Sequence, residues 1–366
     1  MGRVCVTGGC GWFGLRVADE LLGHGHEVVL LDVAALRLDE LDERVHDRRQ
    51  LARARVVQGS VTDSRAVEAA FEGCDGVVHL AAYGQSGLAQ LEKRRVYEVN
   101  VQGAATVLAA CVSRGVQRLV FASTVGVVFC REPIENGDES LPYVPVERHT
   151  CAYTASKMLA ERMLLRANGR PVRCVGGEEA AATTSPRRLR VCSLRFRAIY
   201  GAGELRTTQR AIDEIRGGRY SLCRFGRPRV LTQYSSAENC RLAVRLAYER
   251  LSDERSPVAG SAYFLVDETP VDSFDFWRPV AEAFGRRPPR IRVGLGTMRA
   301  LAGLLEAWGR LTGAEPIATR FEADIVGTTN HFSVARARRE LGYRPRRDHE
   351  LDDVVRLCRS RYGLAE

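Results

Sequence analysis

A tyrosine and a lysine four residues apart have the types and spacing needed for proton transfer. Tyr153 and Lys157, in the segment Tyr-Thr-Ala-Ser-Lys, would lie one above the other on the same face of a helix. A tyrosine hydroxyl has a pKa of about 10, and a nearby positive charge stabilises its phenolate. A phenol held in this way can take the proton of a hydroxyl group while a hydride leaves the same carbon, and it can return the proton in the reverse direction. The pair therefore predicts a site that interconverts an alcohol and a ketone.

Lysine is rare in this chain, which makes its use at position 157 informative. Of the 54 basic residues, only Lys93 and Lys157 are lysines, so a given basic position would be lysine by chance in 2 of 54 cases. Arginine presents a broad planar fork, whereas lysine presents a compact charge on a flexible stem. Position 157 therefore favours a site that needs the geometry of lysine.

A glycine-rich turn near the start of the chain predicts a nucleotide site. The segment lies between a strand-like stretch and a helix, so its glycines would let a diphosphate approach the backbone at a helix N-terminus. Asp32 follows Gly14 by 18 residues, and its carboxylate would accept hydrogen bonds from ribose hydroxyls and repel a 2′-phosphate. The pattern favours NAD over NADP. The turn residues expected at the cofactor are Gly8, Gly11, Trp12, Phe13 and Gly14.

The elements around these residues alternate between strand and helix. We expect strands at residues 3–7, 27–32, 54–58, 76–81, 118–123 and 189–195, and a helix at 152–168. This order is typical of an α/β fold, a Rossmann-type doubly wound parallel sheet with a smaller C-terminal substrate lobe. The expected domains are an NAD-binding domain at 1–199, with a loop insertion at 169–188, and a mainly substrate-binding lobe at 200–366 that is partly interleaved with it.

Two local patterns give further expectations. Asn136-Gly137 is a strong hairpin signal. Leu301, Leu304, Leu305 and Trp308 have the spacing of an amphipathic helix, for which packing on the core is favoured over contact with a membrane surface.

Composition excludes several classes. The formal charge of +9 is spread along the sequence, so we expect no nucleic-acid partner. The eleven cysteines show no metal-ligand spacing, so no metal is expected. No apolar run reaches the roughly 20 residues of a membrane-spanning helix. With Met1 leading almost directly into a strand, we expect no removable leader and reduced thiols in an intracellular protein, either cytoplasmic or peripherally associated with the endoplasmic reticulum membrane.

The glycine spacing and several later segments resemble extended short-chain dehydrogenases/reductases. The matching segments are His79-Leu80-Ala81-Ala82, Asn100-Val101-Gln102-Gly103 and Phe121-Ala122-Ser123-Thr124-Val125. The resemblance implies that Thr124, or else its neighbour Ser123, holds the substrate oxygen near Tyr153. It also implies cofactor contacts from Ser60, Val61, Leu80, Ala81, Ala82, Asn100 and Lys157.

Within that family, the chain is most similar to the 3β-hydroxysteroid dehydrogenase group and its 42E branch. The segments that carry this resemblance are 83–87, 136–143, 194–204 and 335–343. Three positions depart from the pattern: Ser60 replaces an aspartate, Phe196 replaces a proline, and residues 234–239 differ. Ala198 also stands where sugar-nucleotide epimerases usually carry asparagine.

The leading hypothesis is an NAD-dependent dehydrogenase that acts on a steroid or sterol-like secondary alcohol. Possible partners are such a small molecule, a membrane surface contacted peripherally, and a second copy in a homodimer. The alternatives are a cofactor-binding protein with little turnover and a nucleotide-sugar epimerase. The sequence leaves open the substrate, the direction of reaction, an isomerase step and the oligomeric state.

Overall fold

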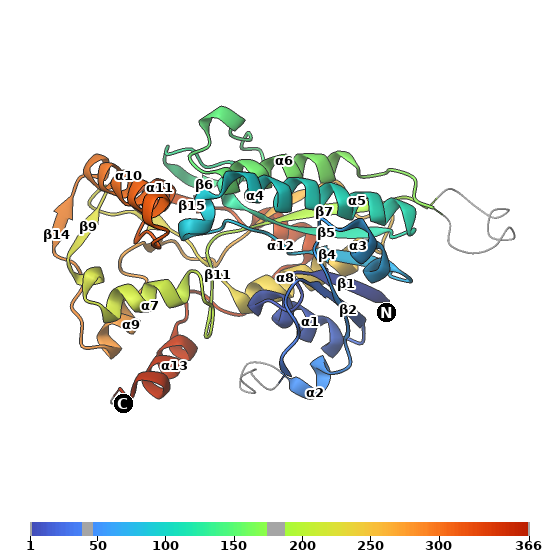
Figure 1. The fold of residues 1–366 in the computed structure, drawn as a ribbon, viewed down its shortest axis with the longest axis horizontal. Helices are drawn as coiled ribbons and strands as arrows, with labels where there is room; N and C mark the ends of the chain where they lie inside the picture. The colour runs from blue at the N-terminus through green and yellow to red at the C-terminus, as the bar shows by residue number, and fades with distance from the viewer. Residues whose placement is uncertain (1, 39–46, 174–186, 365–366) are drawn as a thin grey trace, which may run out of the picture.

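The central feature of the fold is a seven-stranded parallel sheet (Figure 1). The computed structural model describes residues 2–38, 47–173 and 187–364, so most of the loop expected at 169–188 lies outside the described residues. In spatial order the strands are β12 (Ala262–Leu265), β7 (Arg190–Phe196), β5 (Arg118–Thr124), β4 (Gly76–His79), β1 (Arg3–Thr7), β2 (Glu27–Asp32) and β3 (Arg55–Gln58). The expected strands and the expected α/β class are confirmed.

The sheet is buried between two layers of helices, which explains why its central strands are continuous apolar runs. One core lies between the sheet and α1 (Trp12–Gly23) and α8 (Ala237–Arg250). The other lies against α3 (Ser64–Phe71), α5 (Gly103–Ser113) and α6 (Ala152–Arg166). Figure 1 shows α5 and α6 on one side of the sheet and α1 on the other. Because all seven strands are parallel, their carboxyl ends meet at one edge, where a ligand site is expected.

The remaining elements build the lobe beyond that edge. Its strands are β8 (Ile199–Tyr200), β9 (Cys223–Phe225), β10 (Leu231–Thr232), β11 (Ser235–Ser236), β13 (Val271–Asp272), β14 (Ile291–Val293) and β15 (Asn330–Phe332). Its helices are α7 (Thr208–Arg216), α9 (Arg278–Ala283), α10 (Leu295–Thr312), α11 (Arg320–Gly327) and α13 (Asp352–Tyr362), whereas α12 (Ala335–Leu341) packs on α8 and β12 beside the central sheet. The short helices α2 (Arg48–Leu51) and α4 (Lys93–Tyr97) and the strand β6 (Ile134–Gly137) precede it in the chain. The division at residue 199 stays a prediction, and β12 shows that the later chain returns to the central sheet.

Two local expectations were wrong. The Asn-Gly pair does not make a hairpin: Asn136 has the expected left-handed backbone, with φ of 49°, but β6 pairs in parallel with β15, far along the chain. The α10 side chains do not pack on the core as expected. Leu301, Leu304 and Trp308 are exposed, because the helix instead buries Ala302, Glu306 and Gly309.

Among the described residues, no helix is both long and apolar enough to cross a membrane.

Candidate active site

A cavity of about 1720 Å³ extends from the carboxyl edge of the sheet into the lobe. It brings together nearly all of the site residues expected from the sequence. Those that line it are Gly8, Gly11, Trp12, Phe13, Gly14, Asp32, Ser60, Val61, Leu80, Ala81, Ala82, Ser123, Thr124, Tyr153 and Lys157. Asn100 does not line the cavity. The individual roles of these residues stay predictions.

The glycine turn forms a close-fitting cradle at the start of α1. Gly8 has φ of 70°, and a Cβ atom at Gly14 would lie 2.1 Å from the Gly8 carbonyl oxygen, so neither position accepts a larger residue. The helix begins at Trp12 with no side chain capping its first amide groups. Open amides at a helix N-terminus fit the diphosphate of a dinucleotide.

Asp32 and Ser60 line the part of the cavity that the sequence predicts to hold the adenosine, and their side chains differ in the hydrogen bonds they make. Asp32 ends β2, and its carboxylate accepts hydrogen bonds from the backbone amides of Cys10 and Ala34, each at 3.0 Å. These bonds fix the carboxylate beside the glycine turn, which fits ribose hydroxyls. The Ser60 hydroxyl already contacts the Thr62 hydroxyl at 2.8 Å and accepts the Thr62 amide at 3.1 Å. The Ser60 hydroxyl thus stabilises a local turn at this position.

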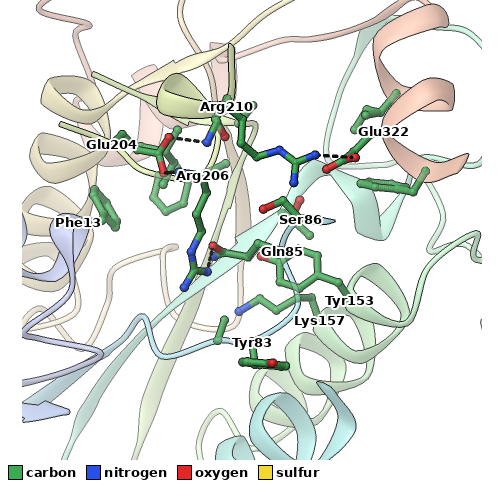
Figure 2. A pocket seen from close by; sticks show the side chains of 18 of the residues that line it. Phe13, Tyr83, Gln85, Ser86, Tyr153, Lys157, Glu204, Arg206, Arg210 and Glu322 are labelled. Atoms are coloured by element: carbon green, nitrogen blue, oxygen red, sulfur yellow. Dashed lines mark hydrogen bonds and ion pairs between the residues drawn. The ribbon is translucent and has the colours of Figure 1, made fainter. Parts of the chain in front are cut away.

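Tyr153 projects from the first turn of α6 into the cavity (Figure 2). Burial raises the pKa of Tyr153 to about 12, while a hydrogen bond with Gln85 and the charge of Arg206 act in the opposite direction. The free protein therefore holds Tyr153 as a protonated phenol at neutral pH. A further positive charge is needed to make it an effective base.

Lys157 lies one turn further along α6 with its ammonium group buried. Its Nζ atom is 4.0 Å from the centre of the Phe121 ring, and its side chain is 2% exposed. Burial lowers the pKa of Lys157 to about 7, and the charge of Glu161 partly offsets this effect. Burial therefore removes the hydration of the Lys157 ammonium group and disfavours its charged form. The group lies one helical turn from the Tyr153 phenol, whose deprotonated form it would stabilise.

Glu161 is a site residue that sequence reasoning missed. It follows Lys157 by one helical turn and is fully buried. One carboxylate oxygen accepts hydrogen bonds from Arg195 at 2.6 and 3.0 Å and from the Tyr143 hydroxyl at 2.8 Å, and the other accepts from Ser193 at 2.9 Å. Four bonds hold this charge in place beneath Lys157. The i+4 spacing of a glutamate from a candidate lysine could have indicated it.

Gln85 and Arg206 were also missed, because only the fold brings them to Tyr153. Asn100 bonds the amide and carbonyl groups of Tyr83 at 2.8 and 2.9 Å and so fixes the loop that carries Gln85. The Gln85 side-chain oxygen accepts a hydrogen bond from Arg206, which reaches in from the lobe (Figure 2). Asn100 therefore acts on the loop beside the site and not on the cavity itself.

The two candidate hydroxyls at the end of β5 have different surroundings. The Thr124 oxygen accepts the Gly126 amide at 3.2 Å, which leaves its proton available for a substrate oxygen. The Ser123 hydroxyl is buried and has no partner in the described part of the chain. Both line the cavity, so the preference for Thr124 stays a prediction.

The segments that depart from the resemblance are packed and hydrogen-bonded. Phe196 packs edge-on against Phe13 of the glycine turn, with ring centres 5.9 Å apart. Ser236 and Asn239 both bond Asp267, at 3.0 and 2.7 Å. Ser236 and Asn239 thus support the fold behind the cavity, whereas Tyr234 of the same segment, like Phe196, lines the cavity.

A doubly wound parallel sheet, a glycine cradle with a strand-end aspartate, and a Tyr-x-x-x-Lys pair in one cavity together define a short-chain dehydrogenase/reductase. The 3-beta hydroxysteroid dehydrogenase/isomerase family model matches residues 5–295, and the chain belongs to that family.

Named relatives agree with this assignment. The chain is 37% identical to short-chain dehydrogenase/reductase family 42E member 1 of Danio rerio, over 97% of this chain and 88% of the relative. It is 32% identical to a 3 beta-hydroxysteroid dehydrogenase/Delta 5-->4-isomerase of Mycobacterium tuberculosis, over 94% and 86% of the two chains. The resemblance to the 42E branch is confirmed.

The fold also occurs in solved structures. A UDP-glucose 4-epimerase of Thermus thermophilus in complex with NAD superposes with a TM-score of 0.65 and 21% identity, over 100% of both chains. This likeness extends the fold assignment to the whole chain.

Replacing Asp32 should weaken the preference for NAD. We expect Asp32→Ser to lower the ratio of NAD to NADP affinity at least tenfold, about 1.4 kcal/mol, because the carboxylate no longer repels a 2′-phosphate. Titration calorimetry with both cofactors measures the ratio. Asp253→Ser, in the turn after α8, is the matched control, and an unchanged ratio in Asp32→Ser would refute the assigned role.

Replacing Lys157 by methionine should stabilise the fold most at low pH. In the native state the pKa of Lys157 is about 7, whereas an unfolded chain holds a lysine proton up to about pH 10.4. Below pH 7 both states hold the proton, so the native state bears the full cost of the buried charge. That cost declines as pH rises from 7 to about 10. We expect Lys157→Met to raise the free energy of unfolding by on the order of 4 kcal/mol at pH 6, and by about half as much at pH 9.

Urea unfolding at the two pH values measures this difference, with the exposed Lys93→Met as the matched control. A gain of equal size at pH 6 and pH 9 would contradict the buried-charge interpretation.

Proposed function

We propose that this protein is an NAD-dependent oxidoreductase that interconverts a secondary alcohol and a ketone on a steroid or sterol-like substrate. The observation that carries the proposal is that the Tyr153 and Lys157 pair opens onto a cavity whose far side is mostly apolar. The apolar side chains that the lobe contributes are Phe225, Tyr234, Phe274, Trp277, Met298, Leu301, Leu305, Ile317, Phe321, Ile325 and Val326. Such walls favour a rigid hydrocarbon skeleton.

The chemistry follows from the placement of the side chains. NAD, when bound, supplies the acceptor for the hydride that leaves the alcohol carbon. Thr124 would donate a hydrogen bond to the substrate oxygen, and Tyr153 would take the hydroxyl proton. To act as the base, Tyr153 must first lose its own proton, and the charge of Lys157 stabilises the phenolate that forms. This phenolate becomes a neutral phenol when it takes the substrate proton, and in the reverse direction the phenol returns the proton to the ketone oxygen.

The charges on the substrate side weigh against a nucleotide-sugar. A diphosphate requires available cations, and two arginines of the lobe are already paired, Arg210 with Glu322 at 3.4 Å and Arg219 with Glu214 at 2.7 Å. Arg206 bonds the Gln85 side chain and forms no ion pair with a described residue, so the charge argument covers only the other two. Ala198 lines the cavity where epimerases usually carry asparagine, so it offers no side-chain amide. A nucleotide-sugar epimerase therefore stays the weaker alternative.

A cofactor-binding protein with little turnover is the other alternative. It was suggested by the positions that depart from the resemblance. The packing of Phe196 and the hydrogen bonds of Asn239 are structural contacts that leave the Tyr153 and Lys157 pair intact. Catalysis is therefore the better-supported proposal.

A sterol-like substrate is held mainly in membranes, so peripheral contact with a membrane such as the endoplasmic reticulum fits this function. A homodimer also remains a prediction.

The proposal predicts NADH formation when the protein is given NAD and a panel of 3β-hydroxysteroids. Tyr153→Phe removes only the acidic hydroxyl, so we expect kcat to fall by about 10²- to 10⁴-fold while NAD affinity is retained. Absorbance at the NADH band follows the rate, and mass analysis checks that the product has lost two hydrogens.

Tyr248→Phe is the matched control, because the Tyr248 hydroxyl is buried without a partner among the described residues and does not line the cavity. Full activity in Tyr153→Phe would refute the mechanism. Tight NAD binding with no alcohol oxidised and no ketone reduced would favour the cofactor-binding alternative.

A further inference from the structure

Helix α10 presents an apolar face to solvent. Leu304 is 70% exposed, Trp308 is 62% exposed and Leu311 is 84% exposed. The only acidic residue of the helix, Glu306, faces inward and is paired with Arg320 at 2.9 Å. The outer face of α10 therefore carries large apolar side chains and no negative charge, which is unusual for a surface helix.

An arginine-rich tip adjoins this face. Residues 215–237 and 283–305 contain no aspartate or glutamate, and β9 and β14 join them in parallel, with Cys223 opposite Ile291. Their arginines are Arg216, Arg219, Arg224, Arg227, Arg229, Arg286, Arg287, Arg290, Arg292 and Arg299. The excess of basic over acidic residues looks evenly spread along the sequence, but the fold places much of it at this tip. Figure 1 shows β14, β9 and α10 together at the end of the molecule away from the N-terminus.

Most of these arginines have no carboxylate partner. Arg219, Arg224 and Arg299 form ion pairs with Glu214, Asp272 and Asp324. Six others are exposed and form no ion pair with any residue in the described ranges, namely Arg227, Arg229, Arg286, Arg287, Arg290 and Arg292. Their charge is available to an outside partner.

The apolar face is continuous with the rim of the cavity. Met298 and Leu305 line the cavity from α10, and Leu301 both lines it and is 47% exposed. Leu222 and Ile317 border the same cavity and are also exposed. A surface covering α10 would therefore lie beside the substrate entrance.

We propose that α10 and the β9–β14 tip dock onto the surface of a bilayer that contains anionic lipid, so that an apolar substrate passes from the lipid into the cavity. The apolar face would enter the headgroup and acyl boundary while the arginines bind the negatively charged headgroups. The idea that an apolar substrate is transferred rests on the proposed function, whereas the docking itself does not.

Charge distinguishes this partner from a second copy of the chain. A two-fold dimer would bury the same surface of both copies, and because residues 215–237 and 283–305 contain no aspartate or glutamate, these segments offer the arginines no carboxylate of the second copy. An anionic membrane complements both parts of the surface at once.

Vesicle sedimentation of the full chain tests the docking without any substrate. We expect binding to vesicles of phosphatidylcholine with 30% phosphatidylserine, as an order-of-magnitude composition for an anionic leaflet. Binding should be at least tenfold weaker to phosphatidylcholine alone and should weaken as salt rises. Leu304→Glu/Trp308→Glu should lower binding to the anionic vesicles at least tenfold, and so should Arg290→Glu/Arg292→Glu.

Each double variant has a matched control on the Rossmann domain. Val56→Glu/Val146→Glu removes two exposed apolar residues, and Arg53→Glu/Arg166→Glu reverses two exposed arginines. Both controls should bind vesicles within about threefold of the parent. The net charge falls by two units in the valine control and by four in the arginine control, and charge away from the proposed surface acts only through the screened field. Retained NAD binding and an unchanged unfolding midpoint show that each variant is folded.

Two results would overturn the proposal. One is that Leu304→Glu/Trp308→Glu and Arg290→Glu/Arg292→Glu bind the anionic vesicles as tightly as the parent protein. The other is a parent that ignores vesicles and sediments as a dimer, with Leu304→Glu/Trp308→Glu monomeric, which would make the face a self-association surface. Failure of the proposed function is distinguishable: vesicle binding would then persist while no steroid in cyclodextrin is oxidised. If the docking and the dehydrogenase function are both correct, Leu304→Glu/Trp308→Glu should raise KM at least fivefold for steroid bound to vesicles. The same variant should leave KM unchanged for steroid carried by cyclodextrin.

Discussion

The site depends on one constraint, the burial of the Lys157 ammonium group against the Phe121 ring, where the charge of the Glu161 carboxylate partly compensates for its desolvation. A charge in such a place is expensive unless other groups compensate for it. The four hydrogen bonds to Glu161 come from β7 and from the segment before α6, so the sheet, the helix and the connecting chain all position the lysine. A destabilising charge retained one helical turn from Tyr153 fits the role proposed for Lys157, since catalytic sites often trade stability for activity.

The parallel sheet brings candidate site residues from distant parts of the sequence to its carboxyl edge. The glycine turn follows β1, Asp32 ends β2, and Thr124 ends β5, so hydrogen-bond register brings them together. The lobe then closes the other side with apolar side chains and with arginines, of which Arg210 and Arg219 already have acidic partners. The part of the cavity beside the glycine turn thereby carries polar groups, while the part lined by the lobe is mostly apolar.

Much of this could be predicted from the sequence, because the central strands are continuous apolar runs and the glycine turn has few alternative structures. The candidate residues were found where side chain type and local spacing set the chemistry, as for Tyr153 and Asp32. Other features depend on distant contacts. Asn136 adopted the backbone of a hairpin, but β15 supplied its neighbouring strand. The spacing of the apolar residues of α10 predicted an amphipathic helix, but it could not show which face of the helix would pack against the rest of the protein. Gln85 and Arg206 meet only after the lobe folds over the sheet, and the arginines of the tip are gathered only by the pairing of β9 with β14.

The central claim is tested most directly by the titration of Lys157 itself. Because the sequence contains only two lysines, Lys93→Arg leaves Lys157 as the sole lysine, and protein labelled with ¹³C at the lysine ε-carbon then gives one lysine signal. The account predicts that this signal titrates with a pKa near 7 in the free protein. A midpoint of about 10 or above, the value of a solvated lysine, would contradict it.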